Sequence, residues 1–337
     1  MDAEGARTSP RRPLRRAREA ARVGAAAALA VALRLSGKQV GAALVYHRVA
    51  DRAGDARFEL NPAVAARAFD RQLRFLARFF QLVDASALPT VAAARKRGRR
   101  LPIAVTFDDD LPEHRGVTAP LLRAQGVRAT FFLCGSFFEP ASFFWWEDLQ
   151  TAVDAGTLRP DDVPSLPRDA VADAVASRPR AIHRLAQAIE AMEPDERAAT
   201  ARLLAGVAEP HRAGADRLRE EEARELAESF ELGFHTRRHD VLTTLDDAGL
   251  ARSLTEGRAQ LEQLVGSPLR VIAYPHGKAD GRVVAAVREA AFDVGYTGAH
   301  EVFTSGQDPL SIGRLEPRSG DTLGRFAWSL ARLLLQA

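Results

Sequence analysis

Apolar segments of strand length alternate with helical segments along most of this chain, and this alternation limits the possible folds more than any other feature. The segments that predict strands are Val40 to Tyr46, Gln81 to Asp84, Pro102 to Phe107, Arg128 to Leu133, Glu231 to His235, Leu269 to Tyr274 and Asp293 to Tyr296. Helical periodicity is clearest over Ala63 to Phe80, and a second helix over Ala119 to Gln125 is stopped by Gly126. The alternation predicts a parallel α/β barrel, with its chemistry at the carboxyl ends of the strands.

Two regions depart from this alternation. Residues 147–225 are rich in Ala, Arg and Glu with helical periodicity, and they predict a helical insertion within a barrel domain of residues 39–337. Residues 1–38 form a basic arm with a net charge of +6, which leaves −3 on the rest of the 337-residue chain. A slightly acidic body argues against nucleic acid as a partner, and a basic arm suggests contact with an anionic membrane surface.

The arm also raises the question of targeting. Paired arginines precede an apolar run from Val23 to Leu33, which resembles a signal peptide but is too short to span a bilayer. Because Arg34 closes the run and a strand follows directly, we favour a basic helix at the membrane surface of a cytoplasmic protein; export is the alternative. The single cysteine, Cys134, excludes an internal disulfide.

Three polar clusters follow predicted strands. In the first, Asp108 and Asp109 are adjacent, so their side chains leave the strand in different directions, and one could bind a cation while the other accepts a proton. A helix N-cap or a turn is the alternative explanation for these acids. The third cluster runs from Tyr274 to Gly277; Pro275 lacks an N–H, so the amide of His276 is the next donor and could form part of an oxyanion hole, although a tight turn is the simpler reading.

The second cluster contains His235 and His239, four residues apart. If the chain turns helically there, both imidazoles lie on one face and can share a metal ion. With Asp109 they form a set of two histidines and one carboxylate, which leaves open positions for water and substrate. This set suits Zn²⁺ best, while Co²⁺, Ni²⁺, Mn²⁺ and Fe²⁺ are alternatives.

Together these motifs resemble the polysaccharide deacetylase family of the carbohydrate esterase family 4 type. The resemblance rests on Thr-Phe-Asp-Asp at 106–109, Ala-Thr-Phe-Phe at 129–132, His-Thr-x-x-His at 235–239 and Tyr-Pro-His-Gly at 274–277. An opening Tyr-His-Arg-Val at 46–49 is similar to the subgroup of biofilm poly-N-acetylglucosamine deacetylases. The order and spacing hold from about residue 40 to 318.

The resemblance implies a distorted (β/α)7-type barrel and a metal-dependent hydrolase that removes N-acetyl groups from N-acetylhexosamine units of a polysaccharide or lipid-linked glycan, as in exopolysaccharide biosynthesis. It implies that Asp108 is the catalytic base and that Asp109, His235 and His239 hold one divalent ion. It also implies that the His276 amide stabilises the oxyanion. Hydrolysis of another C–N bond, in a cyclic imide or ureide, and a non-catalytic carbohydrate-binding relic are the alternatives.

The chain departs from the family pattern in several places. Asp110 replaces the usual glycine, and we expect its carboxylate to point to solvent, although it could instead raise the pKa of Asp108 or force a different turn. Ala273 stands where the family often has an arginine that orients the catalytic aspartate. The late Leu-x-His motif, whose histidine is the general acid, is missing. The tail has Arg-Leu-Glu-Pro at 314–317 and no histidine there.

The missing histidine leaves the general acid to be found. In the subgroup with the Tyr-His opening, the resemblance places the general acid in that N-terminal segment, so His47 is the first candidate. It follows a buried strand and so would lie at the barrel mouth, and a histidine that caps backbone is the alternative. His276 is the second candidate and His114 the third. The aromatic residues Phe143 to Trp146 could stack on sugar rings or pack the insertion onto the barrel, and we expect Trp146 to be buried.

Overall fold

The computed structural model describes residues 11–138, 144–212 and 217–336. Its main sheet has eight strands in the order β10–β1–β5–β6–β7–β8–β9, with β4 also paired to β5. The strands are β1 (Val40–Tyr46), β4 (Gln81–Val83), β5 (Pro102–Phe107), β6 (Thr130–Leu133), β7 (Glu231–Phe234), β8 (Val271–Ala273), β9 (Val294–Tyr296) and β10 (Phe303–Thr304). All pairings are parallel except that of β10 with β1.

The sheet is nearly closed by the segment that follows β10. Ile312 bridges to Tyr296 of β9 and Leu315 bridges to Leu44 of β1, so one stretch of chain joins the two ends of the parallel array. Seven parallel strands arranged in this way match the predicted distorted (β/α)7-type barrel. The closure also carries residues 314–316 to the end of β1, where the first polar residues of the predicted site lie.

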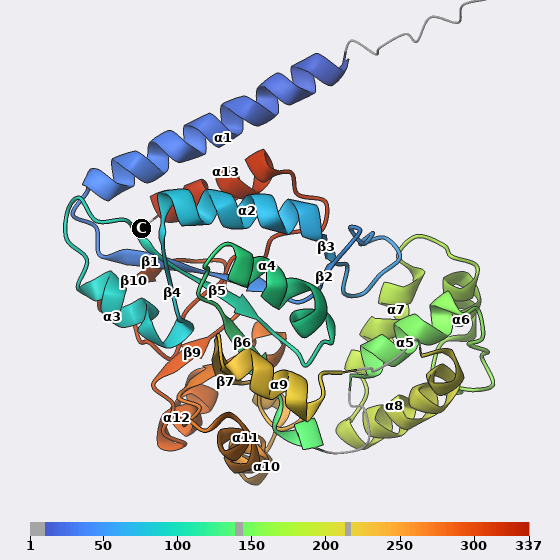
Figure 1. Cartoon of the computed structure of the whole chain (residues 1–337). Coiled ribbons are helices and arrows are strands. Elements are labelled where there is room, and N and C mark those ends of the chain that lie inside the picture. The colour runs from blue at the N-terminus through green and yellow to red at the C-terminus, as the bar shows by residue number, and fades with distance from the viewer. Residues whose placement is uncertain (1–10, 139–143, 213–216, 337) are drawn as a thin grey trace, which may run out of the picture.

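Helices cover the sheet and form a separate group at one side (Figure 1). Those associated with the barrel are α1 (Arg11–Leu35), α2 (Ala66–Phe79), α3 (Leu88–Ala93), α4 (Ala119–Ala124), α9 (Glu220–Ala227), α10 (Asp247–Thr255), α11 (Arg258–Val265), α12 (Gly281–Glu289) and α13 (Leu323–Leu335). The helices of the region predicted as an insertion are α5 (Trp145–Asp154), α6 (Arg168–Val175), α7 (Ala181–Glu190) and α8 (Pro194–Ala208).

The predicted elements agree with the observed ones apart from their ends. β1 and β5 have the predicted bounds, and the other predicted strands are one to three residues shorter. The helix predicted to begin at Ala63 begins at Ala66, because Val64 and Ala65 (β3) pair with Val49 and Ala50 (β2) in a small second sheet. A local helical pattern could not reveal that pairing, since its partner lies about fifteen residues earlier.

The barrel core is made of side chains from strands that are buried on both faces, as expected for a parallel sheet. Aromatic rings fill its centre: Phe107 stacks on Phe131 with 4.7 Å between ring centroids, and Tyr46 meets Phe69 of α2 edge to face at 5.0 Å. This packing fixes the strand ends that carry Asp108 and His47.

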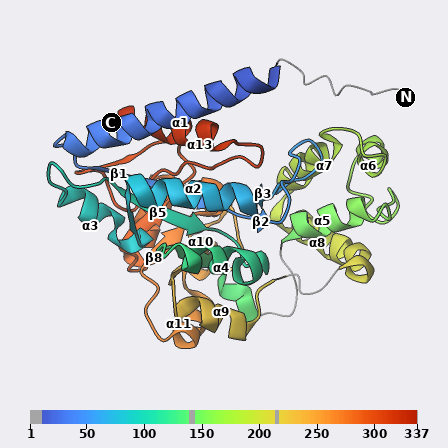
Figure 2. The same ribbon diagram turned by 45° about the horizontal axis from the view of Figure 1, so that its top comes forward.

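The helices α5 to α8 have an apolar core of their own, which includes Val163, Leu185 and Ile189, and Figures 1 and 2 show them beside the barrel. Several contacts connect them to the barrel side, and two of these involve charged or imidazole side chains. Arg48, next to β2, pairs with Glu147 of α5 at 2.6 Å, and His183 of α7 is 2.9 Å from the carbonyl oxygen of Ala56. These contacts hold the helical group against the loop that precedes β3.

Helix α1 lies along α13 on the outside of the barrel (Figure 2). Ala26, Ala30 and Leu33 are buried in this contact. Among the described residues, no helix is both long enough and apolar enough to cross a membrane.

Candidate active site

The structure brings Asp109, His235 and His239 together at the carboxyl ends of β5 and β7. The Asp109 Oδ1 atom lies 3.6 Å from Nε2 of His235 and 3.6 Å from Nε2 of His239. The three potential ligand atoms, one from each residue, all lie within 4.8 Å of one another. Two ligands that are each about 2 Å from a shared ion adopt separations of this size.

The state of Asp109 fits a metal ion. Its side chain is almost fully buried, and its Oδ1 has no hydrogen-bond partner among the described residues. Burial and the neighbouring charge of Asp108 raise the pKa of Asp109 to about 7, against the opposing influence of His47. A carboxylate in such surroundings needs a cation nearby to stay ionised, so the donor set suits a divalent ion.

The ligands are oriented by their surroundings. Nδ1 of His235 lies 2.9 Å from the carbonyl oxygen of Ala273, so this nitrogen donates a proton there and Nε2 is left free to face Asp109. Asp109, His239 and His276 all have positive φ angles, of 70°, 56° and 55°. Backbone strain of this kind persists where the fold forces it and is concentrated at functional sites.

Asp108 is held by Arg314. The guanidinium donates two hydrogen bonds of 2.7 Å, from Nη1 to Oδ1 and from Nη2 to Oδ2 of the carboxylate. Burial alone would raise the pKa of Asp108, but the charge of Arg314 and its hydrogen bonds outweigh burial and lower the pKa to about 2. Arg314 therefore does in this chain what the arginine absent at Ala273 is expected to do.

His47 faces the same group of charges from the end of β1. Its Nδ1 lies 3.5 Å from Oε1 of Glu316. Burial lowers the pKa of His47, but the hydrogen bond to Glu316 and the charges of Asp109 and Asp108 raise it to about 9. His47 is therefore a cation at neutral pH, with a carboxylate behind it and the predicted ligand group in front.

His276 and His114 occupy different surroundings. The ring of His276 lies 4.7 Å from that of His239, and burial with the charge of Lys278 lowers the pKa of His276 to about 4. His114 is fully buried, and its Nε2 lies 3.0 Å from the carbonyl oxygens of both Asp108 and Asp109. It holds the backbone of the two acids rather than facing the cavity.

The expectation that Asp110 points to solvent is wrong. Asp110 is fully buried, its Oδ1 accepts a hydrogen bond of 2.9 Å from the amide of Cys134, and its carbonyl accepts one of 2.7 Å from the amide of Leu218. Because β5 and β6 are neighbours, the Asp110 carboxylate just after β5 reaches the backbone amide just after β6. Asp110 therefore joins three segments of chain beneath the site.

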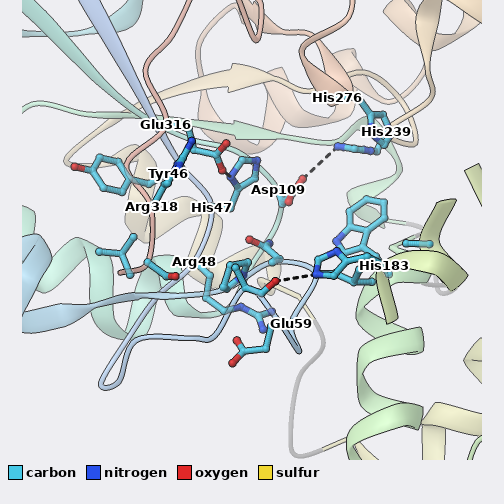
Figure 3. Close-up of a pocket in the computed structure, with 18 of the residues that line it drawn as sticks. Tyr46, His47, Arg48, Glu59, Asp109, His183, His239, His276, Glu316 and Arg318 are labelled. Atoms are coloured by element: carbon cyan, nitrogen blue, oxygen red, sulfur yellow. Dashed lines mark hydrogen bonds and ion pairs between the residues drawn. The ribbon is translucent and has the colours of Figure 1, made fainter. Parts of the chain in front are cut away.

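A cleft of about 710 Å³ lies over these residues, and Figure 3 shows His47, Asp109, His239 and His276 around it. Its far wall comes from the helical group and from the loop before β3. Helix α7 contributes His183, Ala186, Gln187 and Glu190. The cleft therefore lies between the barrel and the α5 to α8 helices, and the site forms its floor.

The expectation that Trp146 is buried is also wrong. Trp145 is the buried member of the pair at 8% exposure, whereas Trp146 is partly exposed and its ring lies 4.7 Å from that of His239. Phe143 lies outside the described residues. Trp146 thus offers an aromatic face beside a predicted metal ligand, where a sugar ring can stack.

Sequence reasoning gave no role to Arg314, Glu316 or Arg48. All three lie in segments without periodicity, and their partners are distant in sequence: Asp108 for Arg314 and His47 for Glu316. One signal was available in the sequence. Asp108 was expected to be the catalytic base, and because Ala273 replaces the arginine that would orient it, another cation was needed beside it. The sequence could not say which of its many arginines supplies it.

Comparison with known proteins supports these observations. A family model described as polysaccharide deacetylase matches residues 182–295, a range that includes His235, His239 and His276. No curated protein matches the chain.

Solved structures match over most of the chain at low identity. A deacetylase from Streptococcus pyogenes, solved with acetate, aligns with a TM-score of 0.58 and 12% identity over 86% of this chain and 97% of its own. A polysaccharide deacetylase from Bacillus cereus aligns with a TM-score of 0.55 and 17% identity over 87% and 69%. IcaB from Ammonifex degensii aligns with a TM-score of 0.53 and 18% identity over 87% and 97%. These likenesses confirm the predicted α/β barrel fold.

Proposed function

We propose that this chain, which matches the polysaccharide deacetylase family model over residues 182–295, hydrolyses the N-acetyl amide of N-acetylhexosamine units in a polysaccharide or lipid-linked glycan. The observation that carries the proposal is the floor of the cleft. There an ionised Asp108, the group formed by Asp109, His235 and His239, and a cationic His47 converge. Amide hydrolysis needs a base, a site for the carbonyl oxygen and an acid, and this floor offers all three.

Asp109, His235 and His239 would hold the divalent ion, Zn²⁺ being our first choice. When bound, such an ion polarises a carbonyl group and lowers the pKa of water. The buried, unpaired Oδ1 of Asp109 and the orientation of His235 by the Ala273 carbonyl support this assignment.

Asp108 would accept a proton from the attacking water while the oxygen of that water forms a bond to the acetyl carbon. The two hydrogen bonds from Arg314 keep the carboxylate ionised and fix its direction. The amide of His276, on a turn where Pro275 has no N–H, would donate to the oxygen that becomes negative.

His47 would give a proton to the departing nitrogen as the C–N bond breaks, so that acetate and a free amine leave. Its raised pKa keeps this proton available at neutral pH, whereas the lowered pKa of His276 leaves that imidazole neutral. This difference favours His47 over His276 as the general acid. Trp146 and the α7 wall would bind the sugar rings.

The test is acetate release from N-acetylglucosamine oligomers with added divalent ions, together with the bound metal content. We expect Asp108→Asn and His235→Ala each to abolish release, with metal lost only from the second. His47→Ala should lower kcat by about 10² to 10⁴-fold at normal metal content. Control variants are His211→Ala and His300→Ala, both at exposed histidines.

Three results would change the proposal. Metal without acetate release would direct the search to ureides and cyclic imides, with the same variants. A protein that binds neither metal nor releases acetate would favour a carbohydrate-binding relic. Near wild-type turnover in His47→Ala would remove His47 as the acid and leave the rest of the proposal standing.

A further inference from the structure

The outer face of α1 is apolar from Leu14 to Leu35. The residues that point away from the barrel recur at helical spacing, and none of them is charged. They are Leu14, Ala17, Ala21, Gly24, Ala25, Ala28, Val31, Ala32 and Leu35, and all are exposed. Leu14, Val31 and Leu35 are 63%, 49% and 58% exposed. Large apolar side chains lined up on a solvent-facing helix indicate a surface that something covers.

The opposite face of α1 already packs against the rest of the protein. The outer stripe is therefore a second apolar surface, which the fold itself leaves uncovered. Ala26, Ala30 and Leu33 are buried in the contact with α13. Glu19 accepts hydrogen bonds from the Thr322 hydroxyl at 2.7 Å and from the Gly324 amide at 2.5 Å, at the start of α13. The helix is thereby fixed with its apolar stripe outward.

Arginines flank the stripe. Arg15, Arg18 and Arg22 lie along one side of it and are exposed, and no acidic partner for them is found among the described residues. On the neighbouring α13 the only charged residues are Arg325 and Arg332, both exposed. The single acid of α1, Glu19, is turned inward to α13.

We propose that this face of α1 docks on the surface of an anionic lipid bilayer, with the apolar stripe in the interfacial region and the flanking arginines on the headgroups. An amphipathic helix with apolar residues between basic flanks has the chemistry for such a surface. A second copy of the chain fits less well, because two copies joined through this face would bring their unpaired arginines together. The proposal does not depend on the catalytic function.

The experiment is co-sedimentation of the full chain with vesicles of pure phosphatidylcholine and with vesicles of equal parts phosphatidylcholine and phosphatidylglycerol. We expect binding to the anionic vesicles only, with loss of binding at high salt. Changing Arg15, Arg18 and Arg22 to Gln together should lower the partition constant on the order of 100-fold. Changing Leu14, Val31 and Leu35 to Gln together should lower it by about tenfold or more.

Matched controls come from the helical group, which lies away from α1 in both Figures 1 and 2. Arg168, Arg178 and Arg202 changed to Gln remove the same charge from another exposed surface, and Leu203→Gln removes a side chain that is 45% exposed on α8. Both controls should bind like the wild type. Thermal unfolding of each variant checks that α1 remains folded on α13.

Two outcomes would overturn the proposal. One is equal binding by the α1 variants and their matched controls: if all bind like the wild type, α1 is not the docking face, and if both arginine sets lose binding equally, only the overall charge matters. The other is absence of vesicle binding with a concentration-dependent dimer that the leucine and valine changes dissociate, which would make a second copy the occupant. Acetate release in solution is a separate measurement, so failure of this proposal leaves the catalytic one untouched.

Discussion

At the scale of single residues, the site depends on two partners that come from the segment closing the barrel. Arg314 keeps Asp108 ionised and oriented, and Glu316 keeps His47 charged. Their roles are opposite in sign: one lowers the pKa of an acid and the other raises the pKa of a base. Both partners lie within three residues, so one short segment sets the charge states of Asp108 and His47.

We predict that Arg314→Ala lowers kcat by at least about 10²-fold while the metal content stays normal. It should also lower stability by about 3–5 kcal/mol, because Asp108 is left as a buried, unpaired charge. Acetate release, metal analysis and urea unfolding measure the three effects. Arg314→Lys should recover part of the stability, and Arg288→Ala, at an exposed pair with Asp308, should change none of them.

A pH profile tests Glu316. The pKa of His47 is raised to about 9, so the protonated acid is present below that pH and is lost above it. The alkaline limb of kcat should therefore fall near pH 9 in the wild type. In Glu316→Gln the first of the raising interactions is gone, and the limb should move to lower pH. An unchanged limb would mean that His47 is not the group that limits activity there.

At the scale of elements, the ends of parallel strands assemble the site. Asp108 and Asp109 leave β5, His235 leaves β7, and His47 leaves β1. Asp110 adds a connection between the β5 and β6 ends through the amide of Cys134. The resemblance leads us to expect glycine at this position, and the aspartate stabilises the turn with a side chain instead.

Asp110→Gly should therefore destabilise the protein. The buried Cys134 amide would lose its acceptor, which costs about 1–3 kcal/mol, and the turn would gain freedom in the unfolded state. Asp110→Asn keeps an acceptor oxygen and should unfold within about 1 kcal/mol of the wild type. Urea unfolding distinguishes the two, and a Gly variant as stable as the Asn variant would contradict this role.

Metal binding belongs to the same scale because its ligands come from two strand ends. A divalent ion that binds only the folded protein should raise Tm, by an amount equivalent to about 2.7 kcal/mol at 100 times the Kd. Thermal unfolding with and without added Zn²⁺ or a chelator measures this. His235→Ala should lose the shift, whereas His211→Ala, at an exposed histidine on the short turn Glu209–His211, should keep it.

At the scale of the whole molecule, the α5 to α8 helices turn an open barrel mouth into a cleft. Helix α7 forms the wall opposite His47, and Arg48 connects the barrel side to Glu147 of α5 at 2.6 Å and to Glu113 at 3.3 Å. In the proposed reaction the floor of the cleft would carry the chemistry, and the wall would meet whatever extends from the reacting sugar. Catalysis and the recognition of glycan length would thus fall to different parts of the chain.

Glu147→Gln should weaken the attachment of this wall without touching the floor. We expect KM for N-acetylglucosamine oligomers to rise several-fold while kcat changes less than about twofold, because the binding surface shifts and the reacting groups do not. Steady-state kinetics on oligomers of increasing length measure this. Asp173→Asn, the same change at an exposed pair with Arg184, serves as the control.

The sequence by itself determined the strand order along the chain, the bounds of β1 and β5, and which acids and histidines follow the strands. These features depend on local periodicity and on the rule that parallel strands gather their carboxyl ends at one face, so a single sequence reveals them.

Only the tertiary structure decided that Arg314 and Glu316 partner Asp108 and His47, that Asp110 is buried, and that Trp146 is the more exposed tryptophan and lies beside His239. Each of these depends on contacts between segments far apart in the chain, for which no local pattern carries a signal. A buried charge must find an opposite charge or a hydrogen bond, but the sequence does not say which distant residue the fold brings to it.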